Sequence, residues 1–248
     1  MPRSRDLAWD GLLNARDLGG HPTEDGGETR WGSVVRADSV RRLTEKGWQS
    51  VVDYGVRTIV DLRSDEELAA DPPVQLPIDA VHVPFFDDRE DVFDEVEAVS
   101  VRAADHAEAT REVYLIFLEH FRRNVASAIR AVASAPEGVV VIHCHGGKDR
   151  TGLTAAFLLR LAGVGIEEIA ADYALSEERL RTRHEQWFAD APDEATLERL
   201  HRIAATPAES MVGVLVEIER RYGGVDGYLR AGGVTDAELA GARARLRD

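Results

Sequence analysis

The stretch VVVIHCHGGKDRTG, residues 139–152, contains the only cysteine of the chain, Cys144, directly after an apolar run. The run is rich in β-branched residues and has glycines on both sides, which predicts a strand buried on both faces over residues 138–143. From Thr151 onward, TGLTAAFLLRLAG has the apolar content of a core-facing helix. The sequence therefore predicts a strand, a glycine-rich turn and a helix N-terminus in series.

Such a turn can bind an anion, because successive backbone N–H groups and the helix dipole both favour negative charge there. The same field favours the thiolate form of Cys144, which is the nucleophilic form. Arg150 follows in the spacing C-x5-R, so one turn of backbone brings its planar guanidinium back over the thiolate to grip two phosphate oxygens. These residues predict phosphoryl transfer to Cys144, with the Thr151 hydroxyl donating to the sulfur when it departs.

Short apolar strands alternate with longer amphipathic segments over the first two thirds of the chain. This alternation predicts an α/β fold with a mostly parallel sheet of four to five strands, helices on both faces and a helical C-terminal third. No repeat or Pro/Ser-rich linker divides the sequence, so we expect one domain over residues 1–248. The expected strands are residues 33–37, 57–62, 79–84 and 138–143.

Helix starts are indicated where Ser or Thr precedes Glu by three residues, the pattern of a capping box. Further helices are expected over residues 175–188 and 211–220. The acidic segment 87–113 has no Gly or Pro and predicts a solvated helix or a mobile cover that closes over the site. The three capping pairs are Ser64 with Glu67, Thr206 with Glu209 (with Pro207 in the first turn) and Thr235 with Glu238.

Composition excludes several classes of protein. The 248 residues carry 45 acidic and 30 basic side chains, a net charge of −15, which argues against a nucleic-acid partner. No apolar run approaches the roughly 20 residues of a membrane span, and the first residues lack the apolar stretch of a secretory signal. We therefore expect a cytoplasmic protein without integral membrane association, while the sequence leaves its oligomeric state open.

Six further stretches accompany the central loop in a pattern that resembles a known family. HCHGGKDRTG resembles the signature loop of the cysteine-dependent protein-tyrosine phosphatase superfamily. Its Lys-Asp-Arg variant is similar to the atypical bacterial tyrosine phosphatases that also accept phosphoinositides. The supporting stretches are NARDLGG (14–20), VVRADSV (34–40), TIVDLRSDEE (58–67), VHVPFFD (81–87), ADYALSEE (171–178) and YGGVDGYL (222–229).

This resemblance implies a tyrosine-phosphatase-like fold and a mechanism. Cys144 attacks phosphorus, a phosphocysteine forms, water hydrolyses it, and Arg150 clamps the phosphate. No metal or organic cofactor is implied. The substrate is a phosphorylated protein, with phosphotyrosine leading, or a phosphoinositide; the alternative from another class is a catalytically silent phosphate-binding module. The phosphate oxygens are held by the backbone N–H groups of His145, Gly146, Gly147, Lys148, Asp149 and Arg150.

Two side chains near the loop have alternative roles. The sequence has no Trp-Pro-Asp segment, and the resemblance points to Asp149 as the general acid. Asp87 is the alternative, because it follows a strand whose carboxyl end faces the site in a parallel sheet. Lys148 either binds a second phosphate, such as a phosphoinositide head group, or pairs with a carboxylate on the surface.

Other polar residues have simpler structural interpretations. His143 and His145 do not predict a zinc site, because no second Cys or His pair has the spacing of metal ligands. Asn14 either reaches the site or ties down the N-terminal segment. Asp61 and Arg63 predict a structural ion pair. The four tryptophans are expected to pack in the core, although one near the mouth could stack on a phosphotyrosine ring.

Overall fold

The central sheet confirms the expected α/β class. The computed structural model describes residues 3–72, 78–87 and 89–247. In these residues five strands lie in the order β1 (Arg16–Asp17), β2 (Val34–Ala37), β5 (Val139–His143), β3 (Val56–Asp61) and β4 (Asp79–His82). Only the pairing of β1 with β2 is antiparallel. All four strands expected from the sequence are present, whereas β1, an Arg-Asp dipeptide without strand propensity, was not expected.

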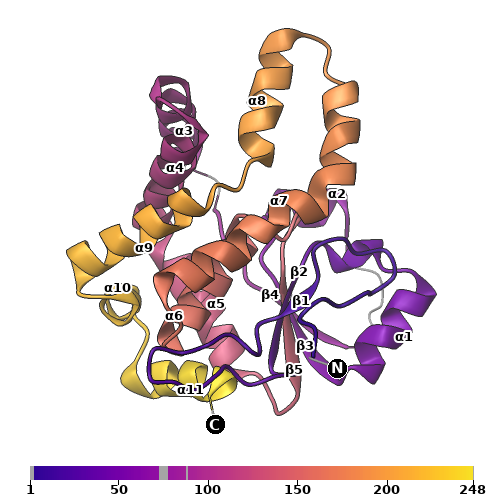
Figure 1. Cartoon of the computed structure of the whole chain (residues 1–248), viewed down its shortest axis with the longest axis vertical. Coiled ribbons are helices and arrows are strands. Elements are labelled where there is room, and N and C mark those ends of the chain that lie inside the picture. The colour runs from indigo at the N-terminus through magenta and orange to yellow at the C-terminus, as the bar shows by residue number, and fades with distance from the viewer. Residues whose placement is uncertain (1–2, 73–77, 88, 248) are drawn as a thin grey trace.

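Both faces of β5, the central strand of the sheet, are buried, which explains its continuous apolar run. Val140 and Ile142 join the larger core cluster, while Val139 and Val141 join a smaller cluster on the other face. The smaller cluster is covered by α1 (Glu45–Asp53) through Val51. The larger one is formed by helices that include α5 (Arg122–Ser134), α6 (Arg150–Leu161) and α11 (Asp236–Leu246). Figure 1 shows α1 and these helices on opposite sides of the strands.

Two helical hairpins project from the same side of the molecule (Figure 1). In the first, α3 (Glu90–Arg102) packs on α4 (His106–His120). In the second, α7 (Ile166–Ala189) runs out beyond the core and α8 (Glu194–Ala204) returns along it. The acidic segment 87–113 therefore contains α3 and the first half of α4; Asp88 lies outside the described residues. Whether this hairpin closes as a cover stays a prediction.

The remaining helices confirm the helical C-terminal third and two of the three capping boxes. Ser64 caps α2 (Asp65–Ala70) and Thr235 caps α11, each with the reciprocal Glu contact. The third was wrong: Thr206 donates its hydroxyl to the Ala174 carbonyl of α7, at 3.1 Å, and caps nothing. The other elements are η1 (Val40–Arg42), α9 (Ala208–Tyr222) and α10 (Val225–Ala231). No helix in the described part of the chain is long and apolar enough to cross a lipid bilayer.

Candidate active site

The loop between β5 and α6 covers residues 144–149, and Arg150 is the first residue of α6, one residue before the helix start that the sequence predicts. Cys144 is buried, with 2% of its surface exposed. Gly147 has φ +65°, and a Cβ at this position would lie 2.4 Å from the backbone oxygen of Ala37. Only glycine fits this turn, because the left-handed conformation and the contact with the end of β2 both exclude a side chain.

Side chains from β2 and from the segment just before β1 donate hydrogen bonds to the backbone carbonyls of the loop. Asn14 donates its amide to the carbonyls of Gly146 and Gly147, at 3.2 and 3.1 Å, and Arg36 donates to the Gly147 carbonyl at 2.8 Å. In a trans peptide the N–H points opposite to the carbonyl. Turning these carbonyls outward therefore turns the N–H groups of Gly147 and Lys148 inward, where an anion can bind them.

A buried charge cluster positions these outer donors. Asp172 of α7 accepts from Arg16 at 2.8 Å and from Arg36 at 2.7 Å, and Arg16 donates to the Asn14 side chain at 2.6 Å. Burial alone would raise the pKa of Asp172, but the two guanidinium groups hold it well below its usual value. Asn14 thus does both things considered from the sequence: it ties down the N-terminal segment and supports the loop.

The guanidinium of Arg150 is held by Glu67 of α2 through two hydrogen bonds, one of them 2.8 Å from Nη2 to Oε1. The ring of Phe86 lies 5.3 Å from it. Burial alone would raise the pKa of Glu67, but Arg150 lowers it to about 2. Arg150 is therefore a permanently charged group with a fixed orientation. Sequence reasoning identified Glu67 only as a capping residue.

Asp149 is the N-cap residue of α6, and its carboxyl is held at one oxygen. Oδ1 accepts from the Tyr114 hydroxyl at 2.6 Å and lies 2.9 Å from Lys148 Nζ. Burial alone would raise the pKa of the Asp149 carboxyl, but the Lys148 charge and the Tyr114 hydrogen bond lower it below its usual value. Asp149 lines the cavity that contains Cys144; Asp87 is exposed and lies outside the lining of that cavity.

The Lys148 ammonium is bonded to groups of the protein itself. The side chain is only 8% exposed, and Nζ donates to the backbone carbonyls of Ile203 and Ala205, at 2.5 and 3.2 Å, besides contacting Asp149. Of the two roles considered from the sequence, the pairing with a carboxylate is the one observed, although inside the protein and not on its surface. The cation also links the loop to the end of α8.

Above the loop lies a cavity of about 200 Å³ with Cys144 in its lining. The two long hairpin helices supply apolar and aromatic walls: Leu180, His184 and Trp187 from α7 and Ile203 from α8. Trp187 therefore lines the cavity, the place considered from the sequence for a tryptophan that stacks on a phosphotyrosine ring. Burial lowers the pKa of His184, so this histidine is neutral near pH 7.

Comparison with known proteins identifies the family. Residues 7–248 match the tyrosine phosphatase family. The chain belongs to this family. It is 28% identical over 233 residues to a tyrosine-protein phosphatase of Nostoc commune, covering 86% of this chain and 74% of the relative. It is 27% identical over 264 residues to the triple specificity protein phosphatase PtpB of Mycobacterium tuberculosis, covering 92% and 94%. The function is that of a protein-tyrosine phosphatase.

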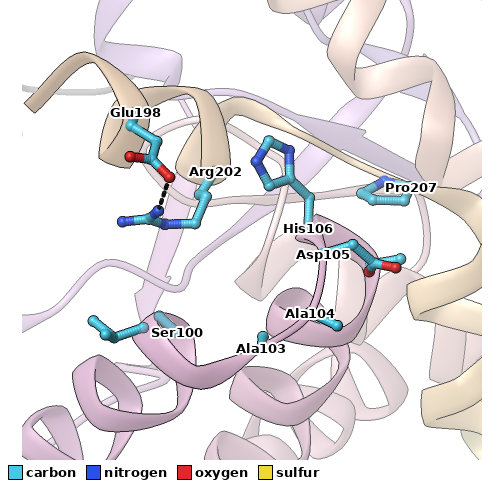
Figure 2. A pocket seen from close by; sticks show the side chains of 10 residues that line it. Ser100, Ala103, Ala104, Asp105, His106, Glu198, Arg202 and Pro207 are labelled. Atoms are coloured by element: carbon cyan, nitrogen blue, oxygen red, sulfur yellow. Dashed lines mark hydrogen bonds and ion pairs between the residues drawn. The ribbon is translucent and has the colours of Figure 1, made fainter. Parts of the chain in front are cut away.

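The cavity of this phosphatase continues into a cleft between the two hairpins. A neighbouring hollow of about 260 Å³ shares Lys148, Asp149 and Ile203 with it and is walled by apolar side chains of α3 and α4. A wider hollow of about 560 Å³ lies farther out and shares Ser100 and Arg202 with the second. Figure 2 shows this outer end, where Glu198 and the Arg202 paired with it lie on α8, opposite the α3–α4 turn. The cleft has room for the parts of a substrate that flank its phosphorylated residue on one side.

Proposed function

We propose that this tyrosine phosphatase hydrolyses phosphate monoesters through a phosphocysteine on Cys144, with phosphotyrosine in proteins as its main substrate. The observation that carries the proposal is that Cys144 and Arg150, at the two ends of one loop, line the same cavity. Inward N–H groups from residues 145–150 would bind the phosphate oxygens. The alternative of a silent phosphate-binding module is disfavoured, because the nucleophile, the clamp and an acid candidate occur together.

Arg150 can clamp phosphate while it stays bound to Glu67. A guanidinium has five N–H donors. Glu67 uses the edge formed by the two terminal nitrogens, so the edge formed by Nε and Nη2 stays available for two phosphate oxygens. Burial alone would lower the pKa of Arg150, but Glu67 raises it above its usual value, so the clamp keeps its charge.

Proton transfer and sulfur departure are assigned to neighbouring side chains. When the substrate dianion binds beside Asp149, its negative charge raises the pKa of the carboxyl, which takes up a proton. In the first step the sulfur of Cys144 attacks phosphorus, and the leaving oxygen takes this proton from Asp149. In the second, water attacks the phosphocysteine and gives its proton to Asp149. The Thr151 hydroxyl is buried and has no hydrogen-bond partner among the described residues, so it is available to donate to the departing sulfur.

Phosphotyrosine fits the cavity better than a phosphoinositide head group. Lys148, the cation that would read a second phosphate, is already bonded to two carbonyls and a carboxylate. The walls from Leu180, Trp187 and Ile203 suit an aryl group instead. The relative from Mycobacterium tuberculosis is named a triple specificity phosphatase, so the proposal includes dual specificity, that is, hydrolysis of phosphoserine and phosphothreonine besides phosphotyrosine.

The proposal is tested with a turnover panel of phosphotyrosine peptides, phosphoserine peptides and phosphoinositides, measured for the wild type and Cys144→Ser. We expect phosphotyrosine to be turned over fastest and the variant to lose at least 10³-fold in kcat on 4-nitrophenyl phosphate, because no thiolate remains. Vanadate should compete with substrate, and Cys144→Ser should still bind phosphate. Turnover retained by the variant would exclude the phosphocysteine, and phosphoinositides turned over fastest would reverse the substrate order.

A further inference from the structure

Two buried tyrosines form a hydrogen-bonded chain that ends on Asp149. Tyr114 of α4 and Tyr173 of α7 are 2% and 1% exposed, and their hydroxyl oxygens lie 2.8 Å apart. Tyr114 donates to Asp149 Oδ1 at 2.6 Å. Neither tyrosine belongs to the loop: Tyr114 lies on α4 and Tyr173 on α7, whereas Asp149 is the loop residue that precedes α6. The mechanism proposed for Cys144, Arg150 and Asp149 gives these two tyrosines no role.

The direction of the hydrogen bonds follows from the number of protons. Each hydroxyl has one proton to donate. Tyr114 gives its proton to the Asp149 carboxylate, so Tyr173 must be the donor in the bond between the two hydroxyls. Burial raises the pKa of both tyrosines above its usual value, so they remain protonated donors throughout the working pH range.

The two carboxylate oxygens of Asp149 are thereby made different. Oδ1 receives the Tyr114 hydroxyl and the Lys148 ammonium. Among the described residues, none donates a hydrogen bond to Oδ2. A proton on the carboxyl therefore belongs on Oδ2, since a proton on Oδ1 would displace one of two existing donors.

We propose that Tyr114, supported by Tyr173, is a positioning residue that anchors Oδ1 of Asp149 and reserves Oδ2 for proton transfer. This inference rests on the proposed role of Asp149 as general acid. In the first step the S–P bond forms, the bond from phosphorus to the leaving oxygen breaks with its electron pair on that oxygen, and the proton passes to it from Oδ2. In the second step the water–phosphorus bond forms, the S–P bond breaks onto sulfur, and Oδ2 takes the proton of water.

The charged groups around Asp149 determine how the loss of the Tyr114 hydrogen bond changes the pKa of its carboxyl. Both anchors stabilise the carboxylate, so removing the Tyr114 hydroxyl should raise the pKa of Asp149 while Lys148 still contacts it. The acid form would then persist to higher pH. The ionisable groups that line the two cavities together with Asp149 are Cys144, His145 and Lys148 of the loop, Arg150 of α6, Glu67 of α2, Glu97 of α3, Tyr114 of α4, Arg183 and His184 of α7, and Arg199 and Arg202 of α8. Tyr173 of α7 lies behind Tyr114.

The test is Tyr114→Phe, measured as kcat/KM against pH on 4-nitrophenyl phosphate and on an alkyl phosphate. The alkyl substrate needs the proton more, so we expect a loss of roughly tenfold on it, about the value of a hydrogen bond to a charged group, and a smaller loss on the aryl substrate. The basic limb of the alkyl profile should move to higher pH. Tyr173→Phe should act in the same direction and less strongly.

Tyr228→Phe is the matched control. Tyr228 is fully buried and donates its hydroxyl to the Leu118 carbonyl at 2.6 Å, so the variant loses an equivalent buried hydrogen bond away from Asp149. It should move neither the basic limb nor the alkyl-to-aryl ratio. The contrary result is that Tyr114→Phe behaves like Tyr228→Phe and lowers kcat/KM by the same factor for the alkyl and the aryl phosphate at every pH. Tyr114 would then have only a structural role, and the inference would be wrong.

Asp149→Asn separates this inference from the proposed function. If Asp149 is the acid, this variant slows the alkyl phosphate more than the aryl phosphate, and adding Tyr114→Phe to it changes nothing further. If Asp149→Asn slows the alkyl phosphate more than the aryl phosphate and Tyr114→Phe does not, Asp149 is the general acid but Tyr114 does not position it. If Asp149→Asn slows both substrates equally, Asp149 is not the acid and the assignment under the proposed function fails first.

Discussion

At the residue scale, the contact between Glu67 and Arg150 places a carboxylate on the proposed phosphate clamp. The pair is partly buried, with 31% of the Glu67 side chain and 13% of the Arg150 side chain exposed. The same Glu67 carboxylate also accepts the N–H of Ser64 at 2.8 Å, which completes the cap of α2. The Glu67 side chain therefore both orients the Arg150 guanidinium and caps the first turn of α2.

This pair predicts a pH dependence of stability. The pKa of Glu67 is about 2 in the folded protein, against 4.5 as its ordinary value. Because the folded value is the lower one, the contribution is complete above about pH 5 and is lost as the pH falls from 4.5 toward 2. Glu67→Gln should cost about 1–2 kcal/mol in the free energy of unfolding at pH 7, between exposed and buried ion pairs.

Urea unfolding of wild type and Glu67→Gln at several pH values measures this contribution. The two free energies should converge as the pH falls. Gln can still complete a capping box, so the charge is the main change. Glu238→Gln is the control, since Glu238 closes the same box with Thr235 and has no Arg ion pair among the described residues. An equal loss in both variants would assign the effect to capping and not to the ion pair.

At the scale of the element, α8 has little core contact and depends on its end. Ala204 is the one buried residue of this helix, and Ile203 is 44% exposed although it lines the cavity. Lys148 donates to the carbonyl of Ile203 and to that of Ala205 just beyond the helix. The loop that begins at Cys144 therefore also anchors the helix that walls the cavity.

Lys148→Met should release α8. The chain has two lysines, and Lys46 is exposed on α1, so Lys46→Met is a control with the same chemical change. Losing two hydrogen bonds from a charged donor should speed local opening, and amide hydrogen exchange over residues 194–204 should become at least about tenfold faster in Lys148→Met. Exchange over α11 should stay as in the wild type. If α8 already exchanged at unprotected rates in the wild type, Lys148 would not be an anchor.

The limits of sequence reasoning follow the same division between local and distant contacts. The strand, turn and helix around Cys144 could be predicted because β-branched residues, two glycines and an apolar helix lie within one stretch. Glu67 lies 83 residues from Arg150 and Tyr114 lies 35 from Asp149, and no local pattern joins such pairs. Thr206 fitted the capping pattern but bonds to α7 instead, since a tertiary acceptor was available to it.

At the scale of the whole molecule, net charge opposes the local chemistry of the site. The chain carries a net charge of −15, and its substrate phosphate is also negative. In the proposed site the loop amides and Arg150 attract phosphate at short range, whereas at long range the net negative charge of the protein repels it. The long-range repulsion acts on encounter and is screened by salt, whereas contacts inside the cavity are screened much less.

The effect of salt on kcat/KM should therefore differ between phosphotyrosine peptides whose flanking residues are acidic and those whose flanking residues are basic. Raising the ionic strength from about 0.01 to 0.15 M shortens the Debye length from about 30 to 8 Å. For a phosphotyrosine peptide with acidic neighbours, kcat/KM should rise several-fold over this range, because repulsion from the acidic surface is screened. For the same peptide with lysines in place of those residues it should fall, since an attraction is lost. If both values fell together, local positive charge at the cleft would outweigh the net charge of the molecule, and Arg199 and Arg202 would be the first residues to neutralise.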